Sequence, residues 1–218
     1  MNPPARQDDS GLRSPHSACP RILDVGCGRK KIPGATGVDR HPLEGVDVVH
    51  NLEQFPYPFA DESFDIIHAH HVIEHLRDPG AFMAELFRIA AAGCSLHLST
   101  PHYSSMGSWR DPTHLHHFSI YTFEYFTEEH PADYYAGGSR WILVRSEIRM
   151  LRLWKRTGLE WLLNLPNRFP SMRWFRKTWE EYGCFLFRAR EIRVLFRAGK
   201  RAGPEPGKSI TQGGFKNQ

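Results

Sequence analysis

The sequence predicts an α/β fold with a doubly wound, mostly parallel sheet, helices on both faces and an antiparallel strand pair at its C-terminal end. Two observations predict it. Short apolar runs alternate with helical patterns over the first hundred residues, which is typical of a parallel sheet. After residue 138, two long and partly alternating runs follow, over residues 141–149 and 185–196, and they suit an antiparallel pair.

The chain of 218 residues is long enough for one domain with a substantial core. Its hydrophobic content of 40% and charged content of 24% are ordinary for a globular protein. Residues 1–18 and 201–218 are rich in Pro, Ser, Gly or charge and lack periodicity, so we expect disordered tails there. A single domain is expected over residues 19–200, in two halves, 19–100 and 101–200.

Five strands are expected in the first half, each from a short apolar run: Arg21–Val25, Thr36–Asp39, Asp47–His50, Phe64–Ala69 and Cys94–Ser99. The fourth run is apolar enough to be buried on both faces of the sheet. A short helix is expected over Val72–Leu76. A longer helix should begin at Asp78 and Pro79, an N-cap and first-position pair, and end at Gly93, where a C′ glycine is favoured.

Composition argues against several classes of protein. No stretch approaches the ~20 apolar residues that cross a bilayer, and the N-terminus shows no apolar signal core. The four cysteines are widely spaced with no CxxC pair, which argues against a disulfide framework and favours a reducing, cytoplasmic location.

The stretch from Ile22 to Gly28, followed by Thr36–Asp39, indicates a binding site. It predicts a buried strand, a glycine turn and a second buried strand that ends in an acid. Ligands of doubly wound sheets bind beyond the carboxyl ends of such strands, and glycines let the backbone approach them closely. Asp39, at the tip of the second strand, is placed to bind the two hydroxyls of a ribose. The pattern therefore favours a cofactor that contains adenosine.

The glycine motif distinguishes between two such cofactors. A dinucleotide-binding fold uses G-x-G-x-x-G, but the run from Gly26 to Lys31 lacks the third glycine. An acid, Asp24, opens the motif. It suits a ligand with ammonium and sulfonium charges and would be unfavourable beside a pyrophosphate. S-adenosylmethionine is therefore the expected cofactor.

Three segments together resemble the class I S-adenosylmethionine-dependent methyltransferases, in their type 11-like group. They are the Asp24-x-Gly26-x-Gly28 motif and the segments Pro56–Asp65 and His70–Leu76. The resemblance implies a Rossmann-like fold, with residues 19–100 as the cofactor-binding half and residues 101–200 as the acceptor or lid half. It also implies that the methionine end is lined by Asp24, Gly26 and Gly28, the ribose held by Asp39, the adenine flanked by Asn51 and Leu52, and the transferable methyl placed near His70.

One departure from this family concerns the link from Arg29 to Ala35. Most members have a helix of three or four turns there, but this link is short, and Pro33 and Gly34 are poor helix formers. We expect a loop or a single turn, as in a subgroup with a short first helix. Glu74 and His75 are interpreted as a pair that supports a loop at a helix start.

The loop after the fifth strand is expected to form the acceptor side of the site, and it resembles the same subgroup. A histidine with a pKa near neutral suits removal of a proton from an oxygen acceptor. His114, oriented by Asp111, is the predicted base, with His102 or His116 as substitutes. The alternative is a structural turn, because Asp before Pro is common at turns.

A metal site is not expected from the sequence. His114, His116 and His117 are clustered, but nothing supplies a second set of ligands at the spacing of a closed zinc site.

The C-terminal third is basic and aromatic. Residues 1–137 carry a net charge of −8, whereas residues 138–201 carry +11. Three interpretations stay open: the core of a helical lid with solvated arginines, a surface for anionic lipid or a lipid-linked sugar, and a track for RNA.

These observations predict an enzyme that transfers a methyl group from S-adenosylmethionine to a small-molecule or saccharide-type acceptor, at oxygen. The alternatives are an RNA or protein methyltransferase and a non-catalytic binding subunit that retains the fold. No motif identifies the acceptor.

Overall fold

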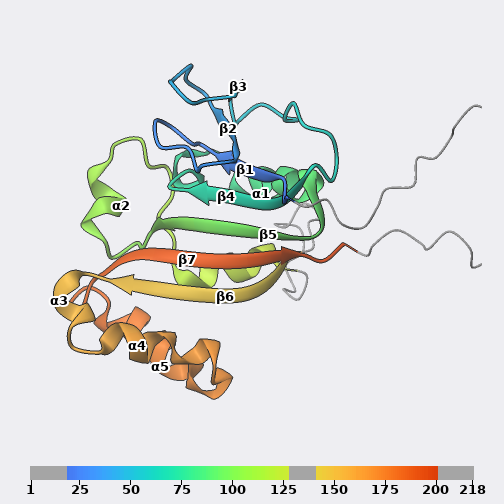
Figure 1. Ribbon diagram of the computed structural model, residues 1–218. Helices are drawn as coiled ribbons and strands as arrows, with labels where there is room; N and C mark the ends of the chain where they lie inside the picture. The colour runs from blue at the N-terminus through green and yellow to red at the C-terminus, as the bar shows by residue number, and fades with distance from the viewer. Residues whose placement is uncertain (1–18, 128–140, 201–218) are drawn as a thin grey trace, which may run out of the picture.

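The computed structural model describes residues 19–127 and 141–200. Seven strands form one sheet in the order β3-β2-β1-β4-β5-β7-β6 (Figure 1). Their bounds are β1 Ile22–Val25, β2 Thr36–Asp39, β3 Val48–Val49, β4 Phe64–His70, β5 Ala90–Pro101, β6 Trp141–Met150 and β7 Ala189–Ala198. The pairs among β1 to β5 are parallel, and β7 runs antiparallel to both β5 and β6. The predicted fold class, a mostly parallel sheet with an antiparallel C-terminal pair, is confirmed. The two tails expected at residues 1–18 and 201–218 lie outside the described residues.

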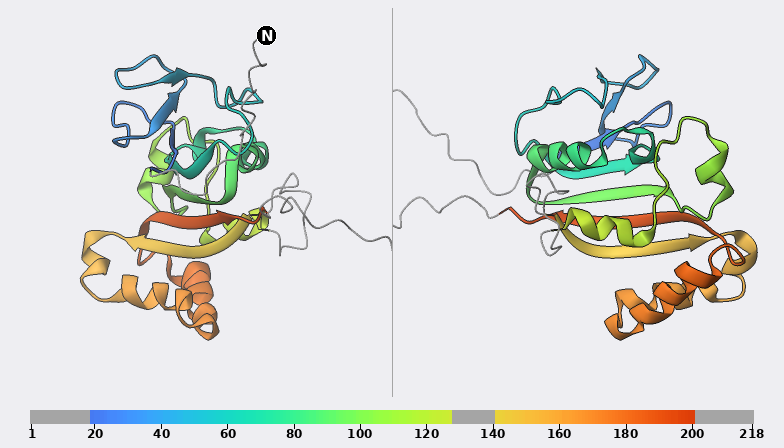
Figure 2. Two further views of the ribbon diagram at one scale, coloured as in Figure 1. Left: turned by 45° about the vertical axis from the view of Figure 1, so that its right-hand side comes forward. Right: turned by 180° about the vertical axis from the view of Figure 1, so that it is seen from behind.

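Helices and helical turns occupy the connections that follow β4. The α-helices are α1 Pro79–Ile89, α2 Met106–Arg110, α3 Arg152–Lys155, α4 Leu159–Asn164 and α5 Arg173–Thr178. The shorter turns are η1 Ile73–His75, η2 Ile120–Phe126, η4 Leu165–Asn167, η5 Pro170–Met172 and the π-helical turn η6 Trp179–Gly183. Seen from behind, α1 and the yellow-green η2 lie on one face of the sheet, and α4 and α5 lie beyond β6 (Figure 2). Among the described residues, no helix is both long enough and apolar enough to span a membrane.

The hydrophobic core lies between the sheet and the two elements, α1 and η2, that cover one of its faces. Side chains that alternate along β7 are buried there, among them Ile192 and Phe196, and they meet Phe82 of α1 and Phe123 of η2 in one hydrophobic cluster. Arg193 and Arg197, which lie between these positions, are exposed.

The opposite face of the sheet is only partly covered by the described residues. His68 and Ile66 of β4 are half-buried and His70 is exposed, so the expected burial of this strand on both faces is wrong. The described helices pack on one face and beside β6, where helices on both faces were expected. The physical reason is that the β1–β2, β2–β3 and β3–β4 links hold no helix.

Two predicted boundaries are also corrected. The helix α1 begins as expected, because the Asp78 side chain accepts the backbone N–H of Ala81 at 2.8 Å. It ends at Ile89, however, and β5 starts at once. Gly93, at φ +75°, lies within β5 near a shift in the β4–β5 register, so its left-handed backbone serves a strand irregularity and not a helix end. Likewise, residues 185–188 precede β7 and are not part of a strand.

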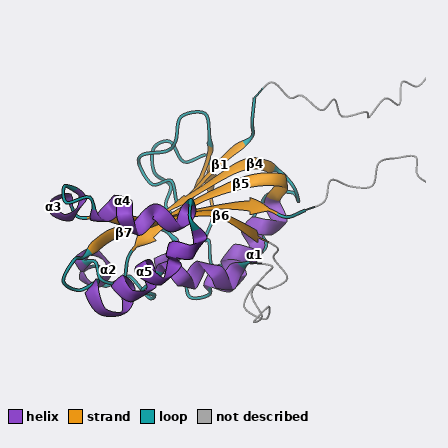
Figure 3. Cartoon of the chain, turned by 90° about the horizontal axis from the view of Figure 1, so that it is seen from below, coloured by secondary structure: helices purple, strands orange, loops and turns teal. Residues whose placement is uncertain are grey.

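The free edge of β6 is capped by side chains of the C-terminal helices. Asn164 donates to the carbonyl of Ile148 and accepts its N–H, both at 2.9 Å. Asn167 bonds in the same two ways to Ser146, at 3.2 and 2.8 Å. These amides replace a neighbouring strand and hold α4 beside the sheet (Figure 3).

Candidate active site

The carboxyl ends of β1, β2 and β4 border a groove of about 500 Å³, which we call the nucleoside groove. Its lining includes four residues predicted to bind the cofactor: Gly26, Asp39, Asn51 and Leu52. The other lining residues are Arg40, His41, Glu53, His71, Val72, His75, Leu76, Arg77, Thr113 and Leu115. The volume is within the usual range for a small-ligand site.

The conformation of the glycine turn is fixed by backbone hydrogen bonds and by close packing. Gly26 has φ +66° and donates its N–H to Val38 at 2.8 Å. A Cβ at this position would lie 2.4 Å from Cγ2 of Val72, so no larger residue fits without displacement. Gly28, at φ +52°, donates its N–H to Asp39 at 3.0 Å. The turn therefore fixes the acid at the tip of the second strand.

Asp24 does not line the nucleoside groove. It is 4% exposed, and its Oδ2 accepts the backbone N–H of Ile32 at 2.8 Å. Burial raises the pKa of Asp24, although the bond from Ile32 and the nearby His70 act in the opposite direction. The link it holds contains only turns, as predicted, and Lys31 ties that link to Asp47 at 2.7 Å.

A second groove, of about 680 Å³, lies on the open face of the sheet across β4, β5, β7 and β6, and we call it the face groove. His70 lines it, and its Nδ1 lies 3.0 Å from the Ser99 hydroxyl. Burial lowers the pKa of His70, and the negative charge of Asp24 opposes this decrease. The structure thus places His70 here and not in the nucleoside groove.

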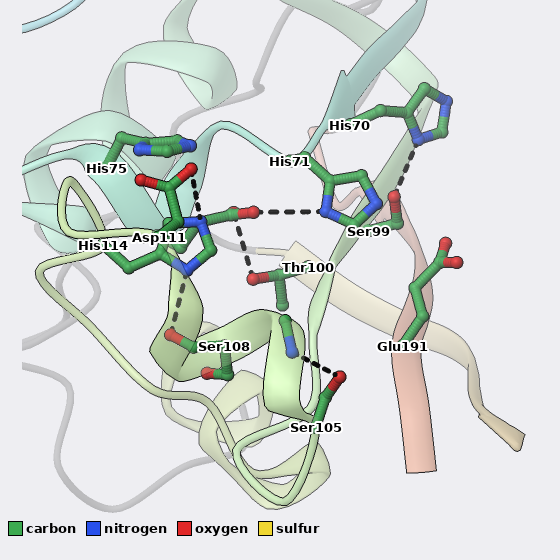
Figure 4. Close-up of polar contacts among 12 residues, drawn as sticks. His70, His71, His75, Ser99, Thr100, Ser105, Ser108, Asp111, His114 and Glu191 are labelled. Atoms are coloured by element: carbon green, nitrogen blue, oxygen red, sulfur yellow. Dashed lines mark hydrogen bonds and ion pairs between the residues drawn. The ribbon is translucent and has the colours of Figure 1, made fainter. Parts of the chain in front are cut away.

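His71 borders both grooves (Figure 4). Its φ of +56° is unusual for a residue with a side chain. Its Nδ1 lies 3.2 Å from Oε1 of Glu74, a hydrogen bond that raises the pKa of His71. Such strained residues cluster at functional sites. His71 was not among the predicted site residues; its position two residues beyond the fourth predicted strand is the signal that could have indicated it.

Comparison with known proteins identifies the family of the chain. A family model described as a methyltransferase domain matches residues 5–198. The chain belongs to this methyltransferase family. It is a class I S-adenosylmethionine-dependent methyltransferase, as the sequence motifs predicted.

Solved structures of similar fold include a SAM-dependent methyltransferase from Archaeoglobus fulgidus, with 19% identity and a TM-score of 0.53 over 83% of this chain and 86% of that one. Another, from Mesorhizobium loti, has 13% identity and a TM-score of 0.49 over 82% and 90% of the two chains. The first of these similarities shows the fold alone. No curated protein matches the sequence in a search.

The nucleoside groove of the methyltransferase fits S-adenosylmethionine. Gly26 lines the groove without a side chain, so a nucleoside can lie against the backbone at this wall. Asp39 lines the groove together with Asn51 and Leu52, the residues for which the resemblance implies contacts with the ribose and the adenine.

The predicted catalytic residues occupy different settings. His114 Nε2 lies 3.9 Å from Asp111 Oδ2, so the two are neighbours, but its ring is oriented by the carbonyl of Ser108, 3.0 Å from Nδ1. The Asp111 carboxylate instead accepts hydrogen bonds from the hydroxyl and the backbone N–H of Thr113. His114 is not among the residues that line either groove.

His102 is fully buried. Its Nδ1 lies 2.8 Å from the Ser104 hydroxyl and its Nε2 3.2 Å from Glu180, which is itself 5% exposed. In this position it joins the loop after β5 to η6, and it does not face an acceptor. His116, the other substitute, contacts the carbonyl of Arg77 at 3.4 Å.

Proposed function

We propose that the enzyme transfers a methyl group to a hydroxyl oxygen of a small, saccharide-type acceptor. The observation that supports this proposal is the polar face groove, which shares His71 with the nucleoside groove. An acceptor in the face groove would therefore lie next to the cofactor.

The lining of the face groove suits a polyhydroxylated molecule. The rings of His68 and His97 line the groove and stack on each other with centroids 4.8 Å apart, so they offer ring edges for contact with a sugar. Glu191 lines the groove beside Arg193, with which it is paired at 2.9 Å, so hydrogen-bond donors and acceptors alternate there. Binding sites of this mixed kind fix the orientation of a ligand through a few placed polar groups.

The chain's own task is to position the acceptor and accept its proton. When bound, the cofactor supplies a methyl group on a sulfonium, which is already a good leaving group. We assign proton removal to His70, because it lines the face groove and its lowered pKa keeps the ring neutral at neutral pH. This replaces His114 as the proposed base.

Cofactor binding is tested first, by titration calorimetry with S-adenosylmethionine. Asp39→Ala should weaken binding by about thirtyfold or more, since bonds to the ribose are lost. Asp47→Ala is the matched control, because Asp47 also accepts a backbone N–H, from Gly37 at 2.7 Å, but does not line the groove. Absence of binding at millimolar cofactor would sink the proposal.

The acceptor is tested with labelled cofactor and fractions of cell extract. We expect label in small or saccharide fractions, and about a hundredfold slower transfer in His70→Asn than in Glu147→Gln, a control that changes another residue of the face groove. Label in RNA or protein would favour the alternative acceptors. Tight cofactor binding without transfer to any fraction would favour a non-catalytic subunit.

We also propose that the C-terminal helices dock on an anionic lipid surface. Trp161 of α4, Trp174 of α5 and Tyr182 of η6 are 69%, 63% and 82% exposed, so they do not form the core of a lid. An apolar groove of about 810 Å³ lies among these helices. The exposed basic side chains of the same segment are Arg152, Lys155, Arg156, Arg168, Arg173 and Lys177. Exposed aromatic and basic side chains together are typical of interfacial binding.

Vesicle co-sedimentation tests this docking. Binding to vesicles with anionic lipid, weakened by salt and by Trp161→Ala but not by Trp109→Ala on α2, is the expected result; Trp109 is 61% exposed and serves as a matched control. Binding to RNA alone, or to neither, would contradict the proposal.

A further inference from the structure

Three metal-ligating side chains meet beside the nucleoside groove. One ligand atom from each of Glu74, His75 and His114 lies within 4.8 Å of the others. The rings of His75 and His114 meet edge to face with centroids 4.6 Å apart, and Figure 4 shows Asp111 beside them. We propose that these residues bind a divalent transition-metal ion of the zinc class.

The His114 imidazole presents a free nitrogen. A carbonyl oxygen only accepts hydrogen bonds, so the 3.0 Å contact from Nδ1 to the Ser108 carbonyl places the proton on Nδ1. The Nε2 atom of the neutral ring then keeps its lone pair. Metal-binding histidines nearly always donate their other N–H to a carbonyl or carboxylate in this way.

The His75 imidazole is held in the same form. Its Nδ1 lies 2.9 Å from the Thr113 hydroxyl and 3.3 Å from the Thr113 carbonyl. The hydroxyl donates its own hydrogen to Asp111 at 2.7 Å, so it must accept from His75. The lone pair of His75 is therefore also on Nε2.

A buried carboxylate completes the set. Glu74 is 1% exposed, and its two oxygens meet His71 at 3.2 Å and the Thr100 hydroxyl at 3.0 Å. Each carboxylate oxygen has room for a further contact. A cation there would balance a charge that burial otherwise disfavours. Asp111, with Oδ2 at 3.9 Å from His114 Nε2, offers a second carboxylate at the rim.

The distances among the three ligand atoms suit a metal ion if the side chains move slightly closer together. Bonds of about 2.0–2.1 Å place neighbouring zinc ligands roughly 3.3 Å apart, so atoms now within 4.8 Å must approach by about 1.5 Å at most. The loop that carries His114 is already fixed to η1, because the N–H of Leu115 donates to the Glu74 carbonyl at 2.8 Å.

Two imidazoles and a carboxylate favour zinc-class ions over calcium or magnesium, which prefer all-oxygen sets. Three protein ligands also leave coordination positions open, as in catalytic zinc sites. His75 lines the nucleoside groove, so the ion would lie at its wall.

No metal site was expected from the sequence because the histidine cluster of a single loop lacks further ligands at the spacing of a zinc site. In the structure, the three histidines of this loop have different surroundings. His116 faces the Arg77 carbonyl, and His117 Nδ1 lies 2.9 Å from the Ser108 hydroxyl. The missing ligands come from η1, far away in the sequence.

The test is direct binding of Zn²⁺ and Co²⁺ to the chelator-treated full chain, without S-adenosylmethionine, so the result is independent of the proposed function. We expect about one ion per chain and a visible Co²⁺ spectrum without a thiolate band. In His75→Asn and His114→Asn, the amide keeps a donor near Nδ1 but removes Nε2, so affinity should fall by at least about tenfold. His117→Asn, in the same loop, should bind like the wild type.

Circular dichroism of the metal-free variants verifies that each is folded. The proposal is overturned if the wild type binds neither ion, if His75→Asn and His114→Asn bind as tightly as His117→Asn, or if the Co²⁺ spectrum indicates cysteine ligands.

Discussion

Oδ2 of Asp24 accepts a hydrogen bond of 2.8 Å from the backbone N–H of Ile32. The acid that opens the glycine motif thus fastens the loop that stands where most family members have a helix. A helix satisfies its own backbone groups, whereas a short loop needs a side chain to do so. In this chain the acid supports the cofactor site through the loop.

Asp24→Ala should lower the free energy of unfolding by about 1–3 kcal/mol, because the buried N–H of Ile32 loses its partner. Asp24→Asn retains a carbonyl oxygen in the same place and should lose less. Urea unfolding measures both. Equal losses in the two variants would show that the hydrogen bond from Ile32 is not what Asp24 contributes.

Gly26→Ala should reduce both stability and affinity for S-adenosylmethionine, since the new methyl group would lie 2.4 Å from Val72 at the groove wall. Gly34→Ala distinguishes a steric clash from the strain of a left-handed backbone. Gly34 also has a positive φ, +79°, but no atom lies within 4 Å of its Cβ position. Gly34→Ala should show only backbone strain of about 1 kcal/mol and normal cofactor affinity. Loss of affinity in both variants, measured by calorimetry, would contradict the steric explanation.

Much of the fold could be predicted from local sequence. The five strands of the first half follow from short apolar runs, and the N-cap at Asp78 and the helix-free link around Pro33 and Gly34 both appear as expected. These features depend on neighbouring residues, which a single sequence displays. The end of α1 could not be located in the same way, because Gly93 serves equally well as a helix end or within an irregular strand.

The site was predicted less completely because it depends on contacts between distant segments. The nucleoside groove contains Gly26 and Asp39 as expected, since both follow directly from strand ends. The burial of His102 against Glu180 and the approach of His114 to His75 arise only when the later loops pack on the sheet. No local pattern in the sequence reports such pairings.

Stability should fall as the pH decreases from about 6.5 to about 4. Burial, with smaller effects of His97 and His70, lowers the pKa of His68 from 6.5 to about 4. Between these values the unfolded chain binds a proton that the folded chain excludes, so acid favours unfolding. The contribution of His68 between pH 7 and pH 5 should be on the order of 2 kcal/mol.

His68→Phe tests the assignment, because it keeps a ring against His97 and removes the titrating group. Urea unfolding of the variant at pH 7 and pH 5 should show a smaller loss than the wild type. An identical pH dependence in both proteins would assign the effect to other groups.

His102 should prove structural and not catalytic. Its Nδ1 accepts the backbone N–H of Ser104 at 3.1 Å, so its proton is on Nε2 and is donated to Glu180. The same Glu180 oxygen accepts the N–H of Ile120 at 3.1 Å, and the contact therefore joins η2, η6 and the loop after β5.

His102→Ala should lower the free energy of unfolding by about 2–3 kcal/mol, because it leaves buried partners unpaired. His102→Gln, which can still donate to Glu180, should recover part of this loss. The rate of labelled methyl transfer per folded molecule should change by less than about threefold in either variant, whereas loss of a general base would reduce it about a hundredfold. A large fall in rate with unchanged stability would return His102 to the catalytic machinery and would require that its buried pocket open to the acceptor.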